Sequence, residues 1–379
     1  MIFIPQANPK ANYLAHKVQI QVIIKKVLES GSYVLGNEVR GFEKYFSYFS
    51  GVKYTVGVNS GTDALQLALR ACGIGNSDAV VTVSHTAVAT VAAIELAGAV
   101  PLLADIEPFT FTISPGSFEA IIKEYKRKFR IKAIIPVHLY GQPADLEKIS
   151  KIASKNKIII IEDCAQSCGA RLAGVKVGSW GQAAAFSFYP TKNLGALGDA
   201  GAVITNDSRI AERVFLLRQY GWRKRLISEI GGTNSRLDEF QAAILKLKIK
   251  YLEQENSRRR QIASLYNYLL LGLPVITPKV REQAEHVFHQ YVICTPLRDK
   301  LKDHLKKIGV LTATHYSIPI HLQPAYKDRL RIVAGGLPNT KKACKEILSL
   351  PMYPELKDKE VRFVCQSIAK FFKGKVNYK

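Results

Sequence analysis

The feature that most constrains the fold is an alternation of short apolar runs and helical stretches between residues 54 and 206. The apolar runs are nearly continuous, without the polar alternation of a strand that is exposed on one face. Helical stretches such as 63–72 and 87–96 lie between them. The strand-like runs are 54–58, 79–84, 100–104, 133–137, 157–162, 183–188 and 202–205. This order predicts an α/β fold with a mostly parallel sheet covered by helices on both faces.

The sequence changes in character after Asn234. Residues 235–269 contain no Gly or Pro and repeat apolar residues at helical spacing, so we expect one long helix or two abutting helices. Prolines then punctuate a region of mixed strands and helices that ends in a helical stretch over 359–372. We therefore expect a large domain over residues 1–250 and a smaller C-terminal α+β domain over residues 251–379.

Composition argues against several classes of protein. Hydrophobic residues make up 47% of the 379-residue chain, but no apolar run reaches the ~20 residues of a membrane span. The N-terminus, MIFIPQANPK, lacks the pattern of a signal peptide, so we expect a cytoplasmic protein without a membrane partner. Only Cys164 and Cys168 lie close together among the six cysteines. Free thiols are therefore favoured over a metal site, since zinc would need a second Cys/His pair at similar spacing.

The formal net charge of +23 leaves three interpretations open. The charge is compatible with nucleic-acid binding, with a generally basic surface, or with attraction of an anionic small substrate. The basic residues are spread widely and cluster only at 123–132, 223–225 and 258–260. No zinc-finger or RNA-recognition motif accompanies them, so we expect no nucleic-acid partner.

The segment NSGTDAL (59–65) is a candidate anion-binding turn. A strand ends here, Gly61 turns the chain, and a helix begins with Thr62 and Asp63 in its first turn. Free backbone N–H groups and the positive end of the helix would face an anion, and the Thr62 hydroxyl adds a donor. The turn has no Walker spacing, and similar strand–Gly–helix turns also occur without a ligand.

Asp163 follows an apolar strand in IEDCAQS (161–167). A carboxylate at the carboxyl end of a buried strand is partly desolvated, and a cationic partner such as a protonated ring nitrogen would stabilise it. The alternative is that Asp163 only caps the following turn.

Lys192 lies in FSFYPTKN (186–193), directly behind another apolar strand. Glycines at 195, 198 and 201 let the backbone pass close to a flat ligand, and Ser187 adds a hydroxyl to an anion site. A lysine beside an apolar strand end loses its proton more readily and can form an imine. The alternative is an exposed loop lysine.

Together the three segments predict a site for pyridoxal phosphate. The turn at Gly61 would hold the phosphate, Lys192 would form a Schiff base with the aldehyde, and Asp163 would keep the pyridine nitrogen protonated. An opposite charge at contact distance shifts a pKa by about 1–3 units, which favours the protonated, electron-accepting ring.

Motifs along nearly the whole chain resemble those of the DegT/DnrJ/EryC1/StrS family of sugar-nucleotide aminotransferases. The motifs are NSGTDALQLAL, IEDCAQSCGA, FSFYPTKNLGALGDAGAV, GTNSRLDEFQAAIL, HLQPAY and LSLPMYPEL. The resemblance implies the fold-type I architecture of aspartate aminotransferase, with a mostly parallel, seven-stranded sheet between helices in the large domain. It also implies a homodimer with shared active sites.

The resemblance further implies roles for single residues. Lys192 matches the lysine that carries the cofactor and moves the proton, and Asp163 matches the partner of the ring nitrogen. Other positions match cofactor-binding residues: Gln166 at the ring hydroxyl, Gly61, Thr62 and Ser187 at the phosphate, and Asn234 supplied by the second subunit.

Within the family, VSHTAVATVAAIEL (83–96), PVHLYGQPAD (136–145) and RQYGW (218–222) resemble the enzymes that aminate C3 of dTDP-3-keto-6-deoxyhexoses, with L-glutamate as donor. This subgroup implies that Tyr189, His315 and Tyr316 lie near the sugar nucleotide, and Arg223 is a candidate for its diphosphate. Amination at C4 of a 4-keto sugar is the alternative.

Two positions depart from the family pattern. Many C4-aminating relatives carry an aromatic side chain that stacks on the cofactor where this chain has Ala87. His85 is a candidate for that stacking role, or else caps the following helix. Ala200 replaces a glycine of the usual G-D-G-G-A motif, which costs about 1 kcal/mol if the position has a positive φ and nothing otherwise.

Overall fold

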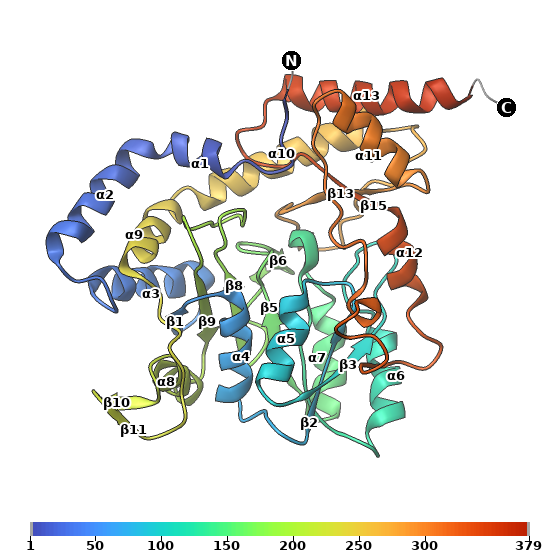
Figure 1. Cartoon of the computed structure of the whole chain (residues 1–379). Coiled ribbons are helices and arrows are strands. Elements are labelled where there is room, and N and C mark those ends of the chain that lie inside the picture. The colour runs from blue at the N-terminus through green and yellow to red at the C-terminus, as the bar shows by residue number, and fades with distance from the viewer. Residues whose placement is uncertain (1–2, 377–379) are drawn as a thin grey trace.

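The computed structural model describes residues 3–376, with an eight-stranded sheet at its centre (Figure 1). The strand order is β1-β9-β8-β5-β4-β2-β3-β14. The strands are β1 (Tyr54–Val58), β2 (Asp78–Val83), β3 (Val100–Ala104), β4 (Arg130–Ile134), β5 (Ile159–Asp163), β8 (Ala183–Ser187), β9 (Gly201–Thr205) and β14 (Arg331–Ile332). Neighbouring strands from β8 to β14 pair in parallel, whereas β9 is antiparallel to both β1 and β8. The predicted α/β class with a mostly parallel sheet is confirmed.

The eighth strand was not expected from the sequence. Seven strands come from residues 54–205, as predicted, but β14 comes from the C-terminal part and pairs with Leu102 and Leu103 of β3. Two residues carry no recognisable strand periodicity, so this strand could not be found from the pattern alone. The C-terminal part therefore completes one edge of the sheet.

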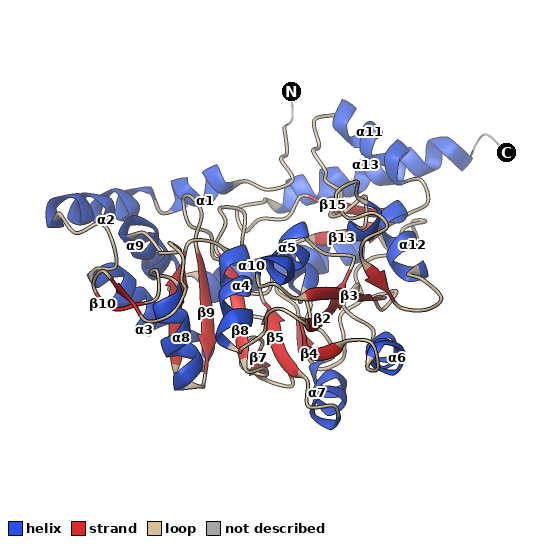
Figure 2. Ribbon diagram, turned by 60° about the horizontal axis from the view of Figure 1, so that its bottom comes forward, coloured by secondary structure: helices blue, strands red, loops and turns tan. Residues whose placement is uncertain are grey.

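Helices cover both faces of the sheet (Figure 2). Helix α4 packs against β8 and β9 and lies beside α5 and α8, while α6 contacts β3 and α7 contacts β5. Phe42 and Phe46 of α3 pack edge-on against Phe186 and Phe188, which fixes α3 to the sheet. The helices of this part are α1 (Pro9–Ala15), α2 (Lys17–Ser30), α3 (Asn37–Ser50), α4 (Gly61–Ala71), α5 (Val88–Leu96), α6 (Pro115–Tyr125), α7 (Leu146–Lys155), α8 (Ser208–Leu217) and α9 (Glu239–Lys248).

The helical segment after residue 235 consists of two abutting helices, which was one of the two expected arrangements. Helix α9 ends at Lys248, and α10 (Leu252–Leu269) begins after three intervening residues. The remaining helices are α11 (Arg298–Lys307), α12 (Pro338–Glu346) and α13 (Asp358–Val376), with short 3-10 turns at Leu139–Gly141 and Ile320–Leu322. The remaining strands are β6 (Arg171–Leu172), β7 (Val175–Lys176), β10 (Trp222–Lys224), β11 (Ile227–Ser228), β12 (Ala284–Glu285), β13 (Tyr291–Cys294) and β15 (Ile347–Leu350).

Helices α10, α11 and α13 and the pair β13–β15 enclose a separate hydrophobic cluster. Ile262, Tyr291 and Leu348 belong to it, and Ile4 joins it from the N-terminal segment. On this basis we propose the domain boundary near residue 250. Within residues 3–376, no helix is both long and apolar enough to cross a membrane.

Candidate active site

The predicted residues converge where parallel strands end, because the carboxyl ends of such strands lie at one edge of the sheet. Asp163 is the last residue of β5, Ser187 is the last of β8, and Gly61 is the first of α4. Gly61 and Ser187 are in close contact, since a Cβ on Gly61 would lie 2.6 Å from the Ser187 Cβ. Lys192 lies close enough to Asp163 for their charges to affect each other's pKa.

The turn before α4 has the geometry of an anion-binding site. The Ser60 side chain accepts a hydrogen bond from the Asp63 N–H at 3.1 Å, so it caps the helix. The N–H groups of Gly61 and Thr62 lie in the first turn and have no acceptor within the helix. Gly201 closes the cup from β9, where a Cβ would lie only 2.3 Å from the Ser60 carbonyl oxygen. The two glycines thus let the strand ends and the start of α4 pack closely, and the free N–H groups of the helix remain available to a phosphate.

Asp163 is a buried carboxylate that forms no ion pair in the described part of the chain. Its Oδ2 accepts a hydrogen bond from the Thr90 hydroxyl at 2.9 Å, and its Oδ1 accepts one from the Ala165 N–H at 3.1 Å. Burial raises the pKa of Asp163, while these hydrogen bonds and the charge of Lys192 oppose the shift. A protonated ring nitrogen would supply the missing positive charge.

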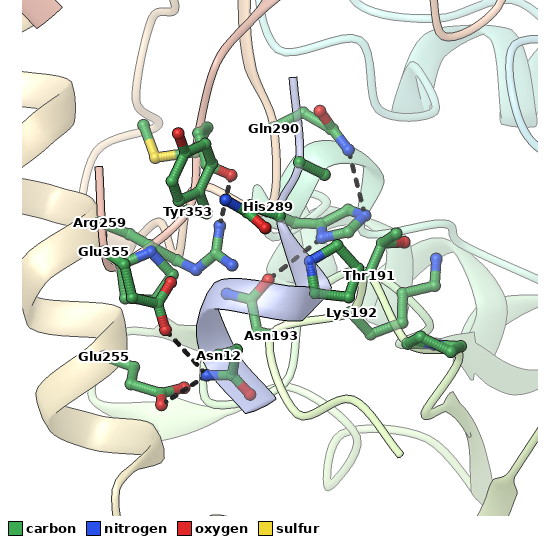
Figure 3. Close-up of a pocket in the computed structure, with 16 residues that line it drawn as sticks. Asn12, Thr191, Lys192, Asn193, Glu255, Arg259, His289, Gln290, Tyr353 and Glu355 are labelled. Atoms are coloured by element: carbon green, nitrogen blue, oxygen red, sulfur yellow. Dashed lines mark hydrogen bonds between the residues drawn. The ribbon is translucent and has the colours of Figure 1, made fainter. Parts of the chain in front are cut away.

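Lys192 is partly buried, and its side chain extends away from Arg259 and Glu255 (Figure 3). Its backbone N–H donates to the Tyr189 carbonyl at 2.8 Å, which fixes the turn. No hydrogen bond engages Nζ within residues 3–376. Burial lowers the pKa of Lys192 to about 8, against the opposing effect of Asp163. These properties suit a reactive amine better than a solvated loop lysine.

Gln166 and the His315–Tyr316 pair lie together beside this lysine. The Gln166 side chain accepts from the Tyr140 N–H at 2.7 Å and donates to the Tyr316 hydroxyl at 3.3 Å. Burial and the charge of Lys192 lower the pKa of His315 to about 4. Burial and Asp163 raise the pKa of Tyr316 to about 12, so the phenol stays protonated.

His85 does not fit the stacking role considered for it. The imidazole is fully buried, and its Nε2 pairs with the Tyr140 hydroxyl at 2.8 Å. Its Nδ1 lies 3.4 Å from the Cys344 sulfur. A ring enclosed in this way presents no open face to a ligand, and it also does not cap α5, whose N-cap residue is Ala87.

Three further candidates lie outside the cluster around Lys192 or at its rim. Tyr189 is 52% exposed next to the lysine turn. Arg223 pairs with Glu212 at 2.6 Å and Glu229 at 2.9 Å, so within one chain it is not brought to the other candidates. Asn234 is exposed, and its side chain forms no hydrogen bond among the residues described. Ala200 has no positive φ, so its replacement of glycine costs nothing.

Sequence reasoning missed Thr90, Tyr140, Asn193 and His289. Thr90 lies in the first turn of α5 and offered no signal beyond a hydroxyl in an apolar stretch. Tyr140 donates its hydroxyl to the His315 carbonyl, 175 residues away in sequence. Asn193 follows the lysine directly, and His289 contacts it from a distant segment.

His138, Glu162 and Cys164 form a compact buried group behind β5. Glu162 accepts hydrogen bonds from three backbone N–H groups in residues 178–181. His138 Nδ1 accepts the Ala144 N–H at 3.0 Å, so its Nε2 donates to Glu162 at 3.0 Å. Because these hydrogen bonds already engage the His138 nitrogens and the Glu162 oxygens, the group fixes the loop over residues 178–181 rather than offering free ligand atoms to a metal ion.

The residues present fit pyridoxal phosphate. The glycine-lined cup matches a phosphate, the unpaired buried carboxylate matches a protonated pyridine, and the partly deprotonated amine matches an aldehyde. The phosphate-binding turn at Gly61 follows β1 and Lys192 follows β8, so only the folded sheet brings these cofactor-binding groups together.

Comparisons with known proteins agree with this site. The sequence profile of the DegT/DnrJ/EryC1/StrS aminotransferase family matches residues 15–369. The chain is 43% identical to a pleiotropic regulatory protein of Geobacillus stearothermophilus, over 98% of this chain and 99% of that protein. It is 41% identical to the dTDP-3-amino-3,4,6-trideoxy-alpha-D-glucose transaminase of Streptomyces venezuelae, over 96% and 95%. It is 38% identical to the UDP-N-acetyl-3-dehydro-alpha-D-glucosamine 3-aminotransferase of Acidithiobacillus ferrooxidans, over 98% of each.

Comparison with a solved structure also supports membership of this family. The crystal structure of S. venezuelae DesV in complex with a ketimine intermediate superposes with a TM-score of 0.94 at 40% identity, covering 98% of this chain and 99% of that one. This likeness extends over the whole fold-type I architecture expected from the sequence. The chain therefore belongs to the DegT/DnrJ/EryC1/StrS aminotransferase family and is a pyridoxal-phosphate-dependent aminotransferase.

Proposed function

We propose that this aminotransferase moves an amino group from L-glutamate to C3 of a dTDP-3-keto-6-deoxyhexose. The product would be a dTDP-3-amino-3,6-dideoxyhexose, made in the cytoplasm for a surface polysaccharide such as an O-antigen or S-layer glycan, or for a glycosylated natural product. The observation that carries the proposal is the 41% identity, over almost the entire chain, to a relative named as a dTDP-3-amino-sugar transaminase. An excess of basic residues also suits a diphosphate substrate.

The reaction needs one group to move a proton, and Lys192 is suited to this role. Bound pyridoxal phosphate supplies the electron sink for the electrons of a substrate C–H bond. Only a neutral Lys192 Nζ can take the proton from the amino donor and later return one to the sugar carbon. With a pKa of about 8, roughly one lysine in ten is neutral at pH 7, compared with fewer than about one in a thousand at the ordinary value.

The other residues hold and polarise the cofactor. Asp163 would keep a proton on the ring nitrogen, and Thr90 fixes the carboxylate through its 2.9 Å hydrogen bond. Gly61, Thr62 and Ser187 would bind the phosphate at the start of α4. Gln166 would bind the ring hydroxyl from the turn after β5, where the Tyr140 N–H already fixes its amide oxygen.

The active enzyme would be a homodimer in which Asn234 reaches the partner's cofactor site. The free side chain of Asn234 supports this role. Large apolar side chains on α2 and on the β10–β11 hairpin also support it, since Val18 is 70% exposed and Leu226 is 75% exposed. Such groups favour burial against a second copy. Dimer assembly would also bring Arg223 and the hairpin toward a neighbouring site.

The site also supports a C3 ketone over the C4 alternative. Ala87, at the N-cap of α5, leaves open the position where many C4-aminating relatives carry an aromatic side chain. Tyr189, His315 and Tyr316 would contact the sugar nucleotide. The nucleotide needs a test of its own, because a relative with 38% identity is named for a UDP sugar with its ketone at C3.

Separate incubations with three ketones test the proposal. The purified protein with pyridoxal phosphate and ¹⁵N-labelled L-glutamate would receive a dTDP-3-keto sugar, a dTDP-4-keto sugar or a UDP-3-keto sugar. We expect ¹⁵N at C3 of the dTDP-3-keto sugar, read by mass spectrometry and NMR, and no turnover by Lys192→Ala. Amination of the 4-keto sugar alone would refute the C3 assignment, and turnover by Lys192→Ala would refute the role of the lysine.

A further inference from the structure

The residue after the lysine, Asn193, is the centre of a buried hydrogen-bond network. Its Nδ2 donates to the Asn256 side chain at 2.8 Å and to the Val287 carbonyl at 3.0 Å. Its Oδ1 faces His289 Nδ1 at 3.1 Å (Figure 3). These four residues come from three segments that are far apart in sequence, so the network exists only in the folded chain.

The direction of each hydrogen bond follows from the carbonyl of Val287. A carbonyl can only accept, so the nitrogen of the Asn193 amide faces Val287 and its oxygen faces His289. His289 must therefore carry its hydrogen on Nδ1. In the neutral ring Nε2 is then an acceptor, and it faces the Gln290 amide nitrogen at 3.4 Å. Gln290 in turn accepts from Gln6 at 2.5 Å.

The network connects the lysine turn to the turn that follows Asp163. Asn256 of α10 receives the bond from Asn193 through its oxygen and donates through its nitrogen to the Cys168 carbonyl at 3.0 Å. Cys168 lies in the turn after β5, two residues beyond Gln166 and five beyond Asp163. Asn256 is fully buried, so no water replaces these bonds. The distance between the reactive amine and its carboxylate thus depends on a side chain from the C-terminal half.

A second contact supports the same turn from below. The Lys248 ammonium is buried and donates to the Gly195 carbonyl at 2.5 Å. Lys192, Asn193, His289 and Gln290 all line one wall of the pocket in Figure 3. The lysine side chain extends away from Arg259 and forms no hydrogen bond with the network (Figure 3).

We propose that Asn193 is a positioning residue for Lys192, and that His289 and Asn256 hold its amide so that the amine stays in its desolvated position facing Asp163. The inference rests on the proposed role of Lys192. It predicts that losing the network leaves the fold intact and lets the lysine side chain reach water. The charged and titratable groups that face the amine are Asp163, His289 and His315.

A pair of His289 variants separates positioning from charge. Burial and the positive charge of Lys192 hold the pKa of His289 well below its usual range, so the ring is neutral and its replacement changes no charge. His289→Gln keeps one donor for Asn193 and one acceptor for Gln290, whereas His289→Phe keeps neither. Asn193→Ala removes the centre of the network. Asn339→Ala is the control, since it loses one comparable bond to the Ile106 carbonyl in a different part of the fold.

The readout is the reactivity of Lys192 in the cofactor-free protein. An amine-specific reagent would label the protein over a range of pH, and mass spectrometry of the Lys192 peptide would give the midpoint. We expect the wild type, His289→Gln and Asn339→Ala to titrate near pH 8. In His289→Phe and Asn193→Ala the midpoint should move toward the ordinary value of 10.5. A midpoint at about 10 would lower the neutral fraction at pH 8 by about 50-fold.

The Lys192 midpoint can be distinguished from an effect on thermal stability and from a loss of turnover. If His289→Phe and Asn193→Ala lower the melting temperature but leave the Lys192 midpoint in place, the network is only structural and the proposal is wrong. The same holds if Asn339→Ala shifts the midpoint equally. Because the labelling uses cofactor-free protein, it remains informative even if Lys192→Ala retains activity and the proposed function fails.

Discussion

The buried carboxylate of Asp163 predicts that one substitution has opposite effects on stability and on catalysis. Asp163→Asn preserves the shape and both hydrogen bonds. The amide oxygen accepts the Ala165 N–H, and the amide nitrogen donates to the Thr90 hydroxyl, whose own hydrogen can turn to Thr86 Oγ1 at 3.1 Å. The variant therefore removes the charge and little else.

The sign of the stability change follows from the pKa. Burial raises the pKa of Asp163 in the folded chain above its ordinary value of 3.8, so ionisation is less favourable there than in the unfolded chain. The wild type keeps its full stability below the ordinary pKa and loses stability as the pH rises through the folded pKa. Replacing the ionised group by a hydrogen-bonded amide removes a desolvation cost of roughly 1–3 kcal/mol.

Cofactor-free Asp163→Asn should thus be more stable than the wild type by about that amount at neutral pH, and equally stable in acid. With cofactor bound, the ring nitrogen loses its anionic partner and its pKa falls by about 1–3 units, so turnover should fall roughly 10- to 1,000-fold. Urea unfolding at the two pH values and steady-state assays measure both effects. Asp207→Asn is the control of opposite sign, because hydrogen bonds from Arg209 lower the pKa of Asp207. A less stable neutral-pH variant, or one with full activity, would refute the reasoning.

Gly201→Ala should lower the free energy of unfolding by about 3 kcal/mol, because its Cβ would lie 2.3 Å from the Ser60 carbonyl oxygen. Gly231→Ala is the matched control, with nothing within 4 Å, and urea denaturation compares the two. Glu239→Gln should cost roughly 1–3 kcal/mol in thermal melts, because the buried carboxylate accepts the N–H groups of Gly36, Glu38 and Val39 and the amide turns a donor toward one of them. Ala200→Gly should destabilise by about 0.4–1 kcal/mol through the unfolded chain, since φ at this position is not positive; a gain in unfolding free energy would show that the backbone there favours glycine.

The main elements of the site could be predicted because they depend on one topological rule. Gly61, Asp163 and Lys192 each follow a recognisable strand, and parallel strands bring such positions to one edge. Local sequence locates the strand ends, and the rule then places residues as distant in sequence as Gly61 and Lys192 within one site. No knowledge of side-chain packing is required for this step.

The orientation of the His85 side chain could not be predicted in this way. Its place after β2 puts its backbone at the correct edge, but the direction of the ring depends on side chains that local sequence does not reveal. Tyr140 and Cys344 provide its partners from 55 and 259 positions away. A histidine that can pair both nitrogens in a buried pocket gains more than one that faces an open cleft. Its orientation was therefore settled by tertiary contacts.

Asn256 is the clearest case of a residue whose role the sequence conceals. It lies in LEQENSRRR, a charged stretch of α10 that is typical of a solvated helix face. The structure buries it completely between Asn193 and the Cys168 carbonyl. The bonds that hold the lysine turn cross the proposed boundary near residue 250, and Val292, Ile320 and Ile347 from beyond it also join the core around the sheet. A fragment ending there would keep Lys192 and Asp163 and lose both Asn256 and His289, so the C-terminal half contributes to the position of the amine as well as to the edge of the sheet.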